Sequence, residues 1–317
     1  MRKRCVHKLK RRMTNYHKGL LLVLGTALVS GLSIFLNTFA VAGIDPNIFT
    51  GLKNIFVGLI IAGVVVLTWQ RREVRALERR DWLWLFVVGF IGGSVPFVLF
   101  FNGLVMTTGA KAGFIHKTLF IYVAFLAFFF LKERLTKAVV LGFLALTIGQ
   151  ILFLQVQPAE LTRGDALILI ATFLWAIELV IAKRLMNRIL PNIIVASRML
   201  FGGLFIGIYV LASGQWQGVL TLTQPQVGWI AVTTLLLTGY VMTFYNGLRY
   251  VPAHVASSVL ALGAPITLLL QAVFQDKTIS PRQIIGMALM TASALVIVRI
   301  VAAIRNRRSY VLARDHR

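Results

Sequence analysis

Long uninterrupted apolar segments constrain the fold of this chain more than any other feature of its sequence. Each segment is close to the roughly 20 residues that an α-helix needs to cross a hydrocarbon layer about 30 Å thick. The segments are continuous and not alternating, which favours helices over a β-barrel in lipid. The sequence therefore predicts an all-α membrane protein with ten transmembrane helices, at residues 19-41, 47-69, 82-105, 110-131, 137-154, 164-186, 192-213, 227-248, 252-274 and 282-304.

The composition excludes the main soluble classes of protein. Apolar residues make up 58% of the 317 residues, and charged residues make up only 14%, against about 25% in an ordinary globular domain. A soluble enzyme could not keep this much apolar surface away from water. The formal net charge of +23 needs its own explanation, either as contact with nucleic acid or as segregation to one side of a membrane.

The positions of the cations decide between these two explanations. If successive helices alternate in direction, 25 of the 33 Lys and Arg residues fall on the side of the two termini and 4 fall on the other side. Such an excess marks the cytoplasmic side of a membrane protein. We therefore expect an inner-membrane protein with basic cytoplasmic tails at 1-18 and 305-317. These tails are expected to contact anionic lipids and not nucleic acid.

The N-terminal region also resembles a signal peptide, because a basic stretch precedes an apolar stretch that ends in Ala40-Val41-Ala42. However, the apolar stretch from Gly19 is longer than the usual 7–15 residues of a signal peptide. Cleavage would also remove a helix that the internal repeat requires. We therefore retain this segment as the first membrane helix.

The sequence shows no pattern for metal, cofactor or covalent chemistry. Cys5 is the single cysteine, so neither an internal disulfide nor a thiolate metal site can form. The five His residues are scattered, and the chain has no HExxH, Gly-rich phosphate loop or nucleophile elbow. We therefore expect no cofactor and no enzymatic activity. Two other classes of membrane protein are kept as alternatives to a transporter: a membrane-embedded lipid enzyme and a non-transporting assembly subunit.

The chain contains an internal repeat with an offset of 144 residues, at which Phe101-Asn102-Gly103-Leu104 aligns with Tyr245-Asn246-Gly247-Leu248. The repeat divides the membrane part into two five-helix halves, at 19-154 and 164-304. Because five is an odd number, the second half enters the membrane in the opposite direction. An inverted repeat of this kind suits alternating access, with a binding site between the halves near the midplane.

Several residues carry a resemblance to a known family. Phe130-Leu131-Lys132-Glu133-Arg134-Leu135-Thr136 resembles the end of the fourth helix in EamA-type members of the drug/metabolite transporter superfamily. Trp175-Ala176 with Lys183 is similar to the pattern that opens an EamA half, and Arg198 stands where the family often has an Arg. The resemblance implies a transporter of small metabolites, amino acids or drugs, which members of the family mostly move outward.

The first half departs from the family pattern at two places. Gly31-Leu32 replaces the opening Trp, and Ile121 stands where Pro is usual. These departures prevent the substrate from being carried over from the family.

Polar side chains inside the predicted spans are the candidate substrate-binding residues, because a cation at mid-membrane costs about 2.5–3.5 kcal/mol and needs a partner or a wet cavity. By depth they form two predicted clusters, one facing each side. The outer cluster holds Asn37, Lys53, Asn102, His116 and Lys117, and the inner cluster holds Glu178, Arg198, Asn246 and His254. Trp175 is an additional candidate for lining a cavity.

Each candidate has a structural alternative. Glu178 and Arg198 could pair and lock two helices together, whereas a proton-coupling role for Glu178 requires that it be released from such a pair. Lys53 could extend to the surface, and Asn102 and Asn246 could form interhelical hydrogen bonds. Trp175 could serve packing alone.

Three cations against one carboxylate make the predicted cavity positive. We therefore expect a secondary transporter that exports a small polar or anionic metabolite, such as an amino acid or organic acid, by alternating access. Broad-specificity drug efflux is the alternative, and it fits less well because pockets for cationic drugs usually need an unpaired carboxylate. Proton coupling and a homodimer are left open by the sequence.

Overall fold

The computed structural model describes residues 2–40, 43–107, 109–155 and 161–314, and within these ranges the chain is helical with no strand. Ten helical segments in these ranges are long and apolar enough to cross a membrane. The prediction of an all-α, ten-helix membrane protein is therefore confirmed.

The first half consists of five spans, two of which are each made of two helices. They are α1 (Arg2–Ala40), α2 (Pro46–Leu67), α4 (Arg79–Gly93) with α5 (Val95–Leu104), α6 (Gly109–Lys117) with α7 (Leu119–Phe130), and α8 (Lys137–Leu154), and the short α3 (Arg71–Arg75) lies between the second and third spans.

The second half repeats this order of spans. They are α9 (Arg163–Leu185), α10 (Pro191–Ala212), α12 (Gln224–Leu248), α13 (Ala253–Leu260) with α14 (Gly263–Phe274), and α15 (Pro281–Arg314), and the short α11 (Gln217–Leu220) lies between the second and third spans.

The helices begin where the sequence supplies a cap or a proline. Asp45 precedes α2, and its Oδ1 accepts hydrogen bonds from the backbone N–H groups of Asn47 and Ile48. Thr162 and Asp165 form a reciprocal capping box at the start of α9. Such side chains satisfy the N–H groups that the first turn of a helix leaves unpaired, so the ends of these helices are fixed locally.

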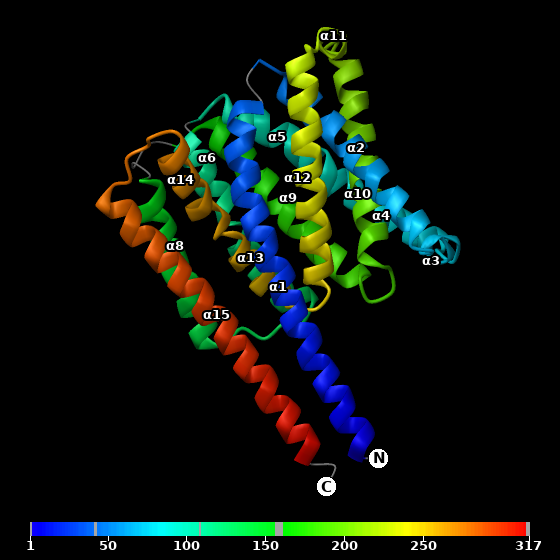
Figure 1. Ribbon diagram of the computed structural model, residues 1–317, viewed down its shortest axis with the longest axis vertical. Coiled ribbons are helices and arrows are strands. Elements are labelled where there is room, and N and C mark those ends of the chain that lie inside the picture. Colours follow the sequence, from blue (N-terminus) through cyan, green and yellow to red (C-terminus); the bar gives the residue numbers. More distant parts are fainter. Residues whose placement is uncertain (1, 41–42, 108, 156–160, 315–317) are drawn as a thin grey trace.

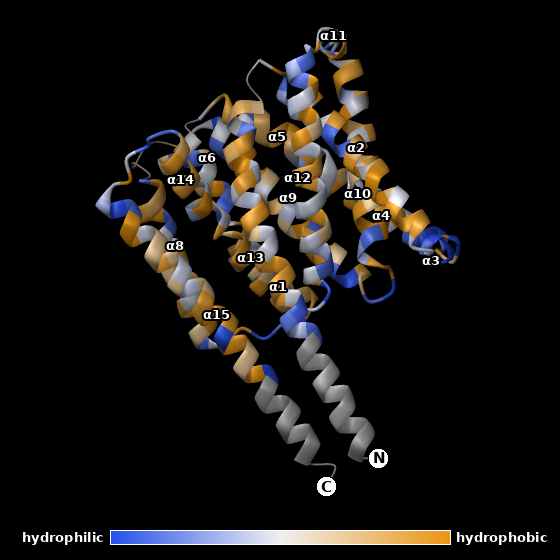
Figure 2. Ribbon diagram, in the orientation of Figure 1, coloured by the Kyte–Doolittle hydropathy of each residue, from blue (hydrophilic) through white to orange (hydrophobic). Residues whose placement is uncertain are grey.

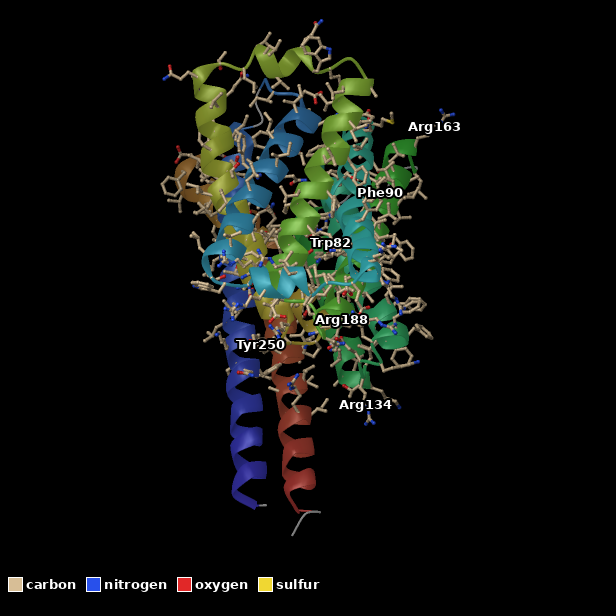
Figure 3. All side chains as sticks on the ribbon, turned by 90° about the vertical axis from the view of Figure 1, so that its right-hand side faces the viewer. Trp82, Phe90, Arg134, Arg163, Arg188 and Tyr250 are labelled. Atoms are coloured by element: carbon tan, nitrogen blue, oxygen red, sulfur yellow. The ribbon has the colours of Figure 1, made fainter. Side chains whose placement is uncertain are left out.

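Both termini lie at one end of the bundle (Figure 1), which we call the terminal end. This end also carries α3 and the turns at 131–136, 186–190 and 249–252. The opposite end, which we call the distal end, carries α11 and the turn at 275–280. Apolar residues cover the sides of the bundle between the two ends, while polar residues gather at α3 and the turns (Figure 2). Arg134 and Arg188 lie toward the terminal end and Arg163 toward the distal end (Figure 3).

The predicted tail and the predicted first span form one helix. α1 begins at Arg2, and α15 continues to Arg314, so most of the regions predicted as basic tails is helical. Lys and Arg have high helix propensity, and neither region contains a proline that would stop the helix. The backbone therefore extends both spans beyond the length that the membrane requires.

The two halves pack in an exchanged manner. α2 packs on α10 and α8 packs on α15, so equivalent helices of the two halves meet each other. α1 packs against α12, α13 and α14 of the second half, while α9 packs against α4, α5, α6 and α7 of the first half. Each first span therefore lies among the third and fourth spans of the other half, as an inverted repeat with a pseudo-two-fold axis requires.

The repeat extends to details of the backbone. The fourth span breaks at Thr118 and the equivalent span breaks at Ala261–Leu262, which are related by the same offset. The turns that follow these spans also match: Lys132 and Asp276 both have positive φ, 56° and 51°.

Both turns close with the same backbone hydrogen bond. The N–H of Glu133 donates to the carbonyl of Ala127 (3.1 Å), and the N–H of Lys277 donates to the carbonyl of Gln271 (3.3 Å). These bonds and the left-handed residue that precedes each of them form the usual helix-ending motif. The two turns thus share one backbone design.

Candidate functional site

A break in the third span exposes two backbone carbonyl groups inside the bundle. Pro96 has no N–H to bond the carbonyl of Gly92, and the N–H of Phe97 donates to Ser94 (2.9 Å) in place of Gly93. A proline removes one helical hydrogen bond and displaces its neighbours. The carbonyl groups of Gly92 and Gly93 are therefore free to accept hydrogen bonds from other helices.

Side chains of three other spans donate hydrogen bonds to these carbonyl groups. Arg198 of α10 donates through Nη2 to Gly92 (2.8 Å), and Trp175 of α9 donates through Nε1 to the same oxygen (3.0 Å). Asn54 of α2 donates to the carbonyl of Gly93 (2.9 Å). The break in the third span is thus the place where α2, α9 and α10 are joined by hydrogen bonds.

Glu178 and Arg198 form a buried ion pair beside this break. Arg198 Nε lies 3.5 Å from Glu178 Oε1, and the hydroxyl of Tyr245 donates to the same Oε1 (2.7 Å). Glu178 is packed directly on Gly92, where an added Cβ would come within 2.2 Å of its Cγ. The pairing of Glu178 with Arg198, one of the two alternatives from the sequence, is the arrangement found in the structure.

Trp175 connects this ion pair to His116. The centroid of its ring lies 4.9 Å from the ring centroid of His116 and 5.7 Å from that of Phe100. Nδ1 of His116 is buried and has no hydrogen-bond partner among the described residues. The outer and inner candidates that were predicted as two separate clusters are therefore in part brought together through Trp175.

Lys117 is a cation without a partner. It is half-buried at the last residue of α6, where the fourth span breaks. Within the described ranges, no hydrogen bond or ion pair involves its ammonium group. This contrasts with Arg198, whose charge is balanced by Glu178. His116 thus has an unused nitrogen beside the ring of Trp175, and the next residue in the chain, Lys117, is a cation without a partner among the described residues.

Lys53 lies inside the bundle, away from the Glu178 group. Its Nζ donates to Asn37 Oδ1 (3.3 Å) and lies 4.4 Å from the centre of the Phe49 ring. The side chain is 7% exposed, so it does not extend to the surface. Lys53 therefore forms a small polar group of its own near the distal end.

Asn102 and Asn246 do not join the central group, although the repeat relates them. Asn102 is exposed and donates to the carbonyl of Val98 in its own helix (2.7 Å). Asn246 donates to Asn192 Oδ1 of α10 (2.8 Å). Asn246 thus makes an interhelical hydrogen bond, which was the structural alternative for this residue.

A second polar group joins the two halves at the terminal end. Glu133, in the turn after α7, accepts from the backbone N–H of Ala253 (2.7 Å) and of His254 (3.3 Å) at the start of α13. Its Oε2 also lies 2.6 Å from Nδ1 of His254. Lys183 of α9 donates to the carbonyl groups of Leu248, Arg249 and Val251 in the adjacent turn. One turn of the second half is therefore held by both halves.

The environment of Glu133 stabilises its ionised form. Burial acts to raise the pKa of this carboxyl group. The hydrogen bonds from His254 and Ala253 and the charge of Lys183 together lower the pKa by more than burial raises it, so the pKa lies below its ordinary value of 4.5. The carboxylate also faces the N-terminus of α13, where negative charge is favoured. The contact with His254 and Ala253 therefore stabilises the ionised form of Glu133.

The halves are also joined at the distal end, by different residues. Lys111 of α6 lies 2.6 Å from Asp165 of α9, and the hydroxyl of Thr107 donates to the same carboxylate (2.5 Å). At the terminal end, Arg188 adds a further pair with Asp81 (2.9 Å). Ion pairs between the halves thus close both ends of the bundle in this structure.

Three features of the site were missed in the sequence. Glu133 was recognised as part of a motif, but its partner His254 lies 121 positions away. The role of Gly92 as a hydrogen-bond acceptor follows from Pro96, which was a visible signal. Asp165 could have been found from its capping pattern with Thr162, but the contact with Lys111 had no signal in the sequence.

The described residues contain no group of three or more His, Cys, Asp or Glu side chains that could hold a metal ion. The site therefore consists of one compensated ion pair, one lysine without a partner among the described residues, aromatic rings, and two backbone carbonyl groups that accept hydrogen bonds from side chains of other spans. Together with the exchanged five-helix halves, these features define a multi-pass membrane protein of the inverted-repeat transporter type.

The model of the EamA-like transporter family matches residues 17–155 and 162–299. The chain belongs to the EamA-like transporter family, and each match covers one of the two repeats, so the resemblance found in the sequence is confirmed.

Relatives and one solved structure agree with this assignment. The uncharacterized transporter YetK of Bacillus subtilis is 26% identical over 250 residues, which are 75% of this chain and 74% of that protein. The riboflavin transporter ImpX of Fusobacterium nucleatum is 26% identical over 311 residues, which are 90% of this chain and 99% of that protein. A crystal structure with 18% sequence identity matches 88% of this chain and 96% of its own with a TM-score of 0.70, which shows the fold alone.

Proposed function

We propose that this protein is a secondary transporter that exports a small anionic or polar metabolite, such as an organic acid or amino acid, by alternating access. The observation that carries the proposal is the half-buried Lys117, which has no partner among the described residues and lies at the break of the fourth span. An unpaired cation inside a membrane costs about 2.5–3.5 kcal/mol on insertion scales. A substrate carboxylate bound there would offset this cost.

The central group, which adjoins His116, the residue before Lys117 in the chain, also supports an anionic substrate. Glu178 is the one carboxylate of the central group, and Arg198 and Tyr245 already occupy it. Trp175 and Phe100 add aromatic surface beside the unused Nδ1 of His116. Such a site favours a ligand with a negative group and an apolar or ring-shaped body.

Broad-specificity efflux of cationic drugs fits this arrangement less well. That activity needs a carboxylate that a cation can approach, and Glu178 is 3% exposed and paired. A lipid enzyme would need several acid or base groups at one interface, and the central group has only one carboxylate. The relative named as a riboflavin transporter and the aromatic rings of this site make riboflavin a second compound to test.

The orientation is also part of the proposal. We infer that the terminal end faces the cytoplasm and that the membrane is the inner membrane. The reason is that 25 of 33 Lys and Arg residues fall on the side of the two termini when successive spans alternate in direction. Thiol labelling of Cys5 in intact cells tests this: we expect no reaction with an impermeant reagent until the cells are opened. Labelling of Cys5 in intact cells would show that the terminal end faces away from the cytoplasm.

Flux into proteoliposomes tests the transport activity. We expect uptake of at least one organic acid, amino acid or sugar phosphate, measured with and without an imposed pH gradient, and riboflavin is included as a separate compound. A dependence of the flux on the gradient would identify proton coupling. The absence of flux for every compound would contradict the proposed function.

Lys117 is tested by Lys117→Met with Lys277→Met as the matched control. Lys277 is exposed at the distal end, where it donates to Gln271 (3.1 Å). We expect Lys117→Met to lower flux at least about tenfold, since a lost charge–carboxylate contact contributes 1.4 kcal/mol or more. Lys117→Arg should retain part of the flux. Equal flux in Lys117→Met and Lys277→Met would remove Lys117 from the site.

A further inference from the structure

The turn that follows α2 carries a tryptophan at a position where glycine is the usual residue. Trp69 is the second residue after the end of α2 and has a positive φ of 61°. In the second half, the second residue after α10 is Gly214, with a φ of 72°. Helices often end in such a left-handed residue, and glycine is preferred there because a side chain is disfavoured in this conformation. The presence of an indole ring at this position in the first half points to a role for the ring itself.

Two arginines lie over the exposed ring of Trp69. Cζ of Arg71 lies 4.9 Å from the centre of the ring, and Cζ of Arg72 lies 6.0 Å from it. A guanidinium group that is attracted by an aromatic ring still has N–H donors along its edges. Neither guanidinium group donates a hydrogen bond to a residue within the described ranges. The ring therefore holds two cations at the surface with their donors unused.

The carboxylates of this part of the chain do not neutralise its arginines. The segment 69–80 contains five exposed arginines, which are Arg71, Arg72, Arg75, Arg79 and Arg80. Its two carboxylates belong to Glu73 and Glu78, and Glu78 pairs with Arg188 of the second half (3.3 Å). Asp81, at the start of α4, pairs with the same Arg188 (2.9 Å). None of the five arginines forms an ion pair in the part of the chain that the structure describes, so the segment is strongly positive.

The location of the segment matches the level of the lipid headgroups. The segment joins two membrane spans at the terminal end, and α3 lies across the direction of the spans (Figure 3, cyan). Val74 and Leu77 of the segment pack against the core, while its arginines are exposed. Trp82, in the first turn of α4, is also exposed, and tryptophan is typical of the boundary between membrane and water. The arginines are therefore placed where lipid phosphates lie.

The equivalent segment of the second half has no such charge. α11 follows α10 as α3 follows α2, and residues 213–226 contain no charged side chain. Trp216 is exposed there, so both ends of the bundle have a short helix and an exposed indole ring. Since α11 forms without arginines, the fold does not need them to build the short helix α3. The arginines of the terminal end therefore need another explanation.

We propose that the segment 69–80 is a binding site for an anionic phospholipid, whose phosphate is held by Arg71 and Arg72 beside the ring of Trp69. Guanidinium groups donate parallel hydrogen bonds to phosphate oxygens. The exposed Leu67 at the end of α2 offers apolar contact to the part of the lipid below the phosphate. The net positive charge favours anionic lipid over phosphatidylcholine, whose headgroup carries a cation. The site requires only that the chain spans a membrane, so it does not rest on the proposed transport activity.

Native mass spectrometry of the full chain tests the affinity of the site. Protein in neutral detergent is titrated with phosphatidylglycerol and, separately, with phosphatidylcholine. We expect Arg71→Gln/Arg72→Gln to bind phosphatidylglycerol about tenfold or more weakly than the wild type, because each cation near the lipid contributes a factor of roughly five. Phosphatidylcholine should bind equally to both proteins. Equal binding of phosphatidylglycerol by the two proteins overturns the proposal.

The matched control for the affinity is Arg134→Gln/Arg249→Gln. This variant removes two other exposed arginines from the same end of the bundle, so it lowers the net charge by the same amount. We expect it to bind phosphatidylglycerol as the wild type does. An equal loss in the two double variants would reveal a general attraction to the basic end of the protein, and would also overturn the proposal.

Fluorescence quenching in nanodiscs tests where the lipid binds. The emission of Trp69 is obtained as the difference between the wild type and Trp69→Phe, and the emission of Trp216 is obtained in the same way. We expect Trp69 to be quenched more by brominated phosphatidylglycerol than by an equal fraction of brominated phosphatidylcholine, and Trp216 to be quenched equally by both. The preference at Trp69 should disappear in Arg71→Gln/Arg72→Gln and persist in added inorganic phosphate. Its loss in inorganic phosphate would assign the site to a free anion and contradict a lipid site.

Discussion

The turn after α7 and the turn after α14 have the same backbone and different side-chain chemistry. In each turn a residue with positive φ, Lys132 or Asp276, is followed by an N–H that returns to the helix. In the first turn Glu133 follows and reaches across to α13 of the other half. In the second turn Lys277 follows and bonds within its own half, to Gln271.

This difference teaches that duplication reproduces the position of a side chain but not its partner. The backbone places Glu133 and Lys277 at equivalent sites on opposite ends of the bundle. Because only Glu133 joins the halves, the terminal end has a titratable contact at this site and the distal end does not. The distal end is closed elsewhere, by Lys111 and Asp165.

The largest expected effect is the difference in stability between Glu133→Gln and Lys277→Gln, which change the side chains that differ between the two turns. Glu133→Gln should lower the free energy of unfolding by about 2–4 kcal/mol, because His254 and the N-terminus of α13 lose their charged acceptor. Lys277→Gln should change it by less than about 0.5 kcal/mol, since this residue is exposed. Unfolding by denaturant in mixed micelles measures both. Similar losses in the two variants would show that the two turns are energetically alike.

Lys183 should give the next largest effect. Its ammonium group serves three carbonyl groups at the end of α12 and in the turn that follows. Lys183→Met should destabilise the protein by about 1–3 kcal/mol, because buried carbonyl groups are left unpaired. The exposed neighbour Arg184 provides the control, and Arg184→Met should stay within about 0.5 kcal/mol. Equal stability of the two variants would mean that Lys183 does not hold this turn.

A pH dependence should separate the two turns further. The pKa of Glu133 is lowered in the folded protein, so its carboxylate stabilises the fold above its unfolded pKa. This contribution is lost as the pH falls through the folded value, which lies below 4.5. The stability of the wild type should therefore decline more steeply than that of Glu133→Gln as the pH is lowered below about 4.5, while Lys277→Gln should follow the wild type. Parallel curves for all three proteins would contradict the charge state assigned to Glu133.

The smallest effect should be the same in both turns, because it depends on the backbone alone. Lys132→Gly and Asp276→Gly each remove a side chain from a left-handed residue, with φ of 56° and 51°. Each substitution should stabilise the protein by up to about 1 kcal/mol, as glycine adopts this conformation without a steric penalty. Thermal unfolding of the two variants checks this equality. A clear difference between them would show that the turns are not equivalent in backbone strain.

The ten spans and the repeat could be predicted because hydropathy and chain order are local properties of the sequence. The breaks were less visible. Pro96 signals the break at Ser94, and Pro265, which has no N–H to donate to the carbonyl of Ala261, signals the break at Ala261–Leu262. The break at Thr118 has no such signal, because Ile121 stands at the position equivalent to Pro265.

The site was predictable in its members and not in its contacts. Glu178, Arg198 and Trp175 were candidates, yet their common attachment to Gly92 depends on the rotation of three helices. Asn102 and Asn246 occupy equivalent positions of the repeat, but one is exposed and the other bonds to Asn192. A polar residue in a predicted span therefore reveals that a partner is needed, while the fold alone decides which partner it is.

The exchanged packing of α1 has a consequence for synthesis in the membrane. The hydroxyl of Thr26 on α1 bonds to Thr243 (2.8 Å), and the carbonyl of Gly31 accepts from Thr267 (2.9 Å). Both partners belong to helices that the ribosome delivers after most of the chain is complete. α1 is therefore synthesised long before the helices that it packs against. The five spans of the first half, though a complete repeat in sequence, leave α1 without these partners until α12 and α14 have been inserted.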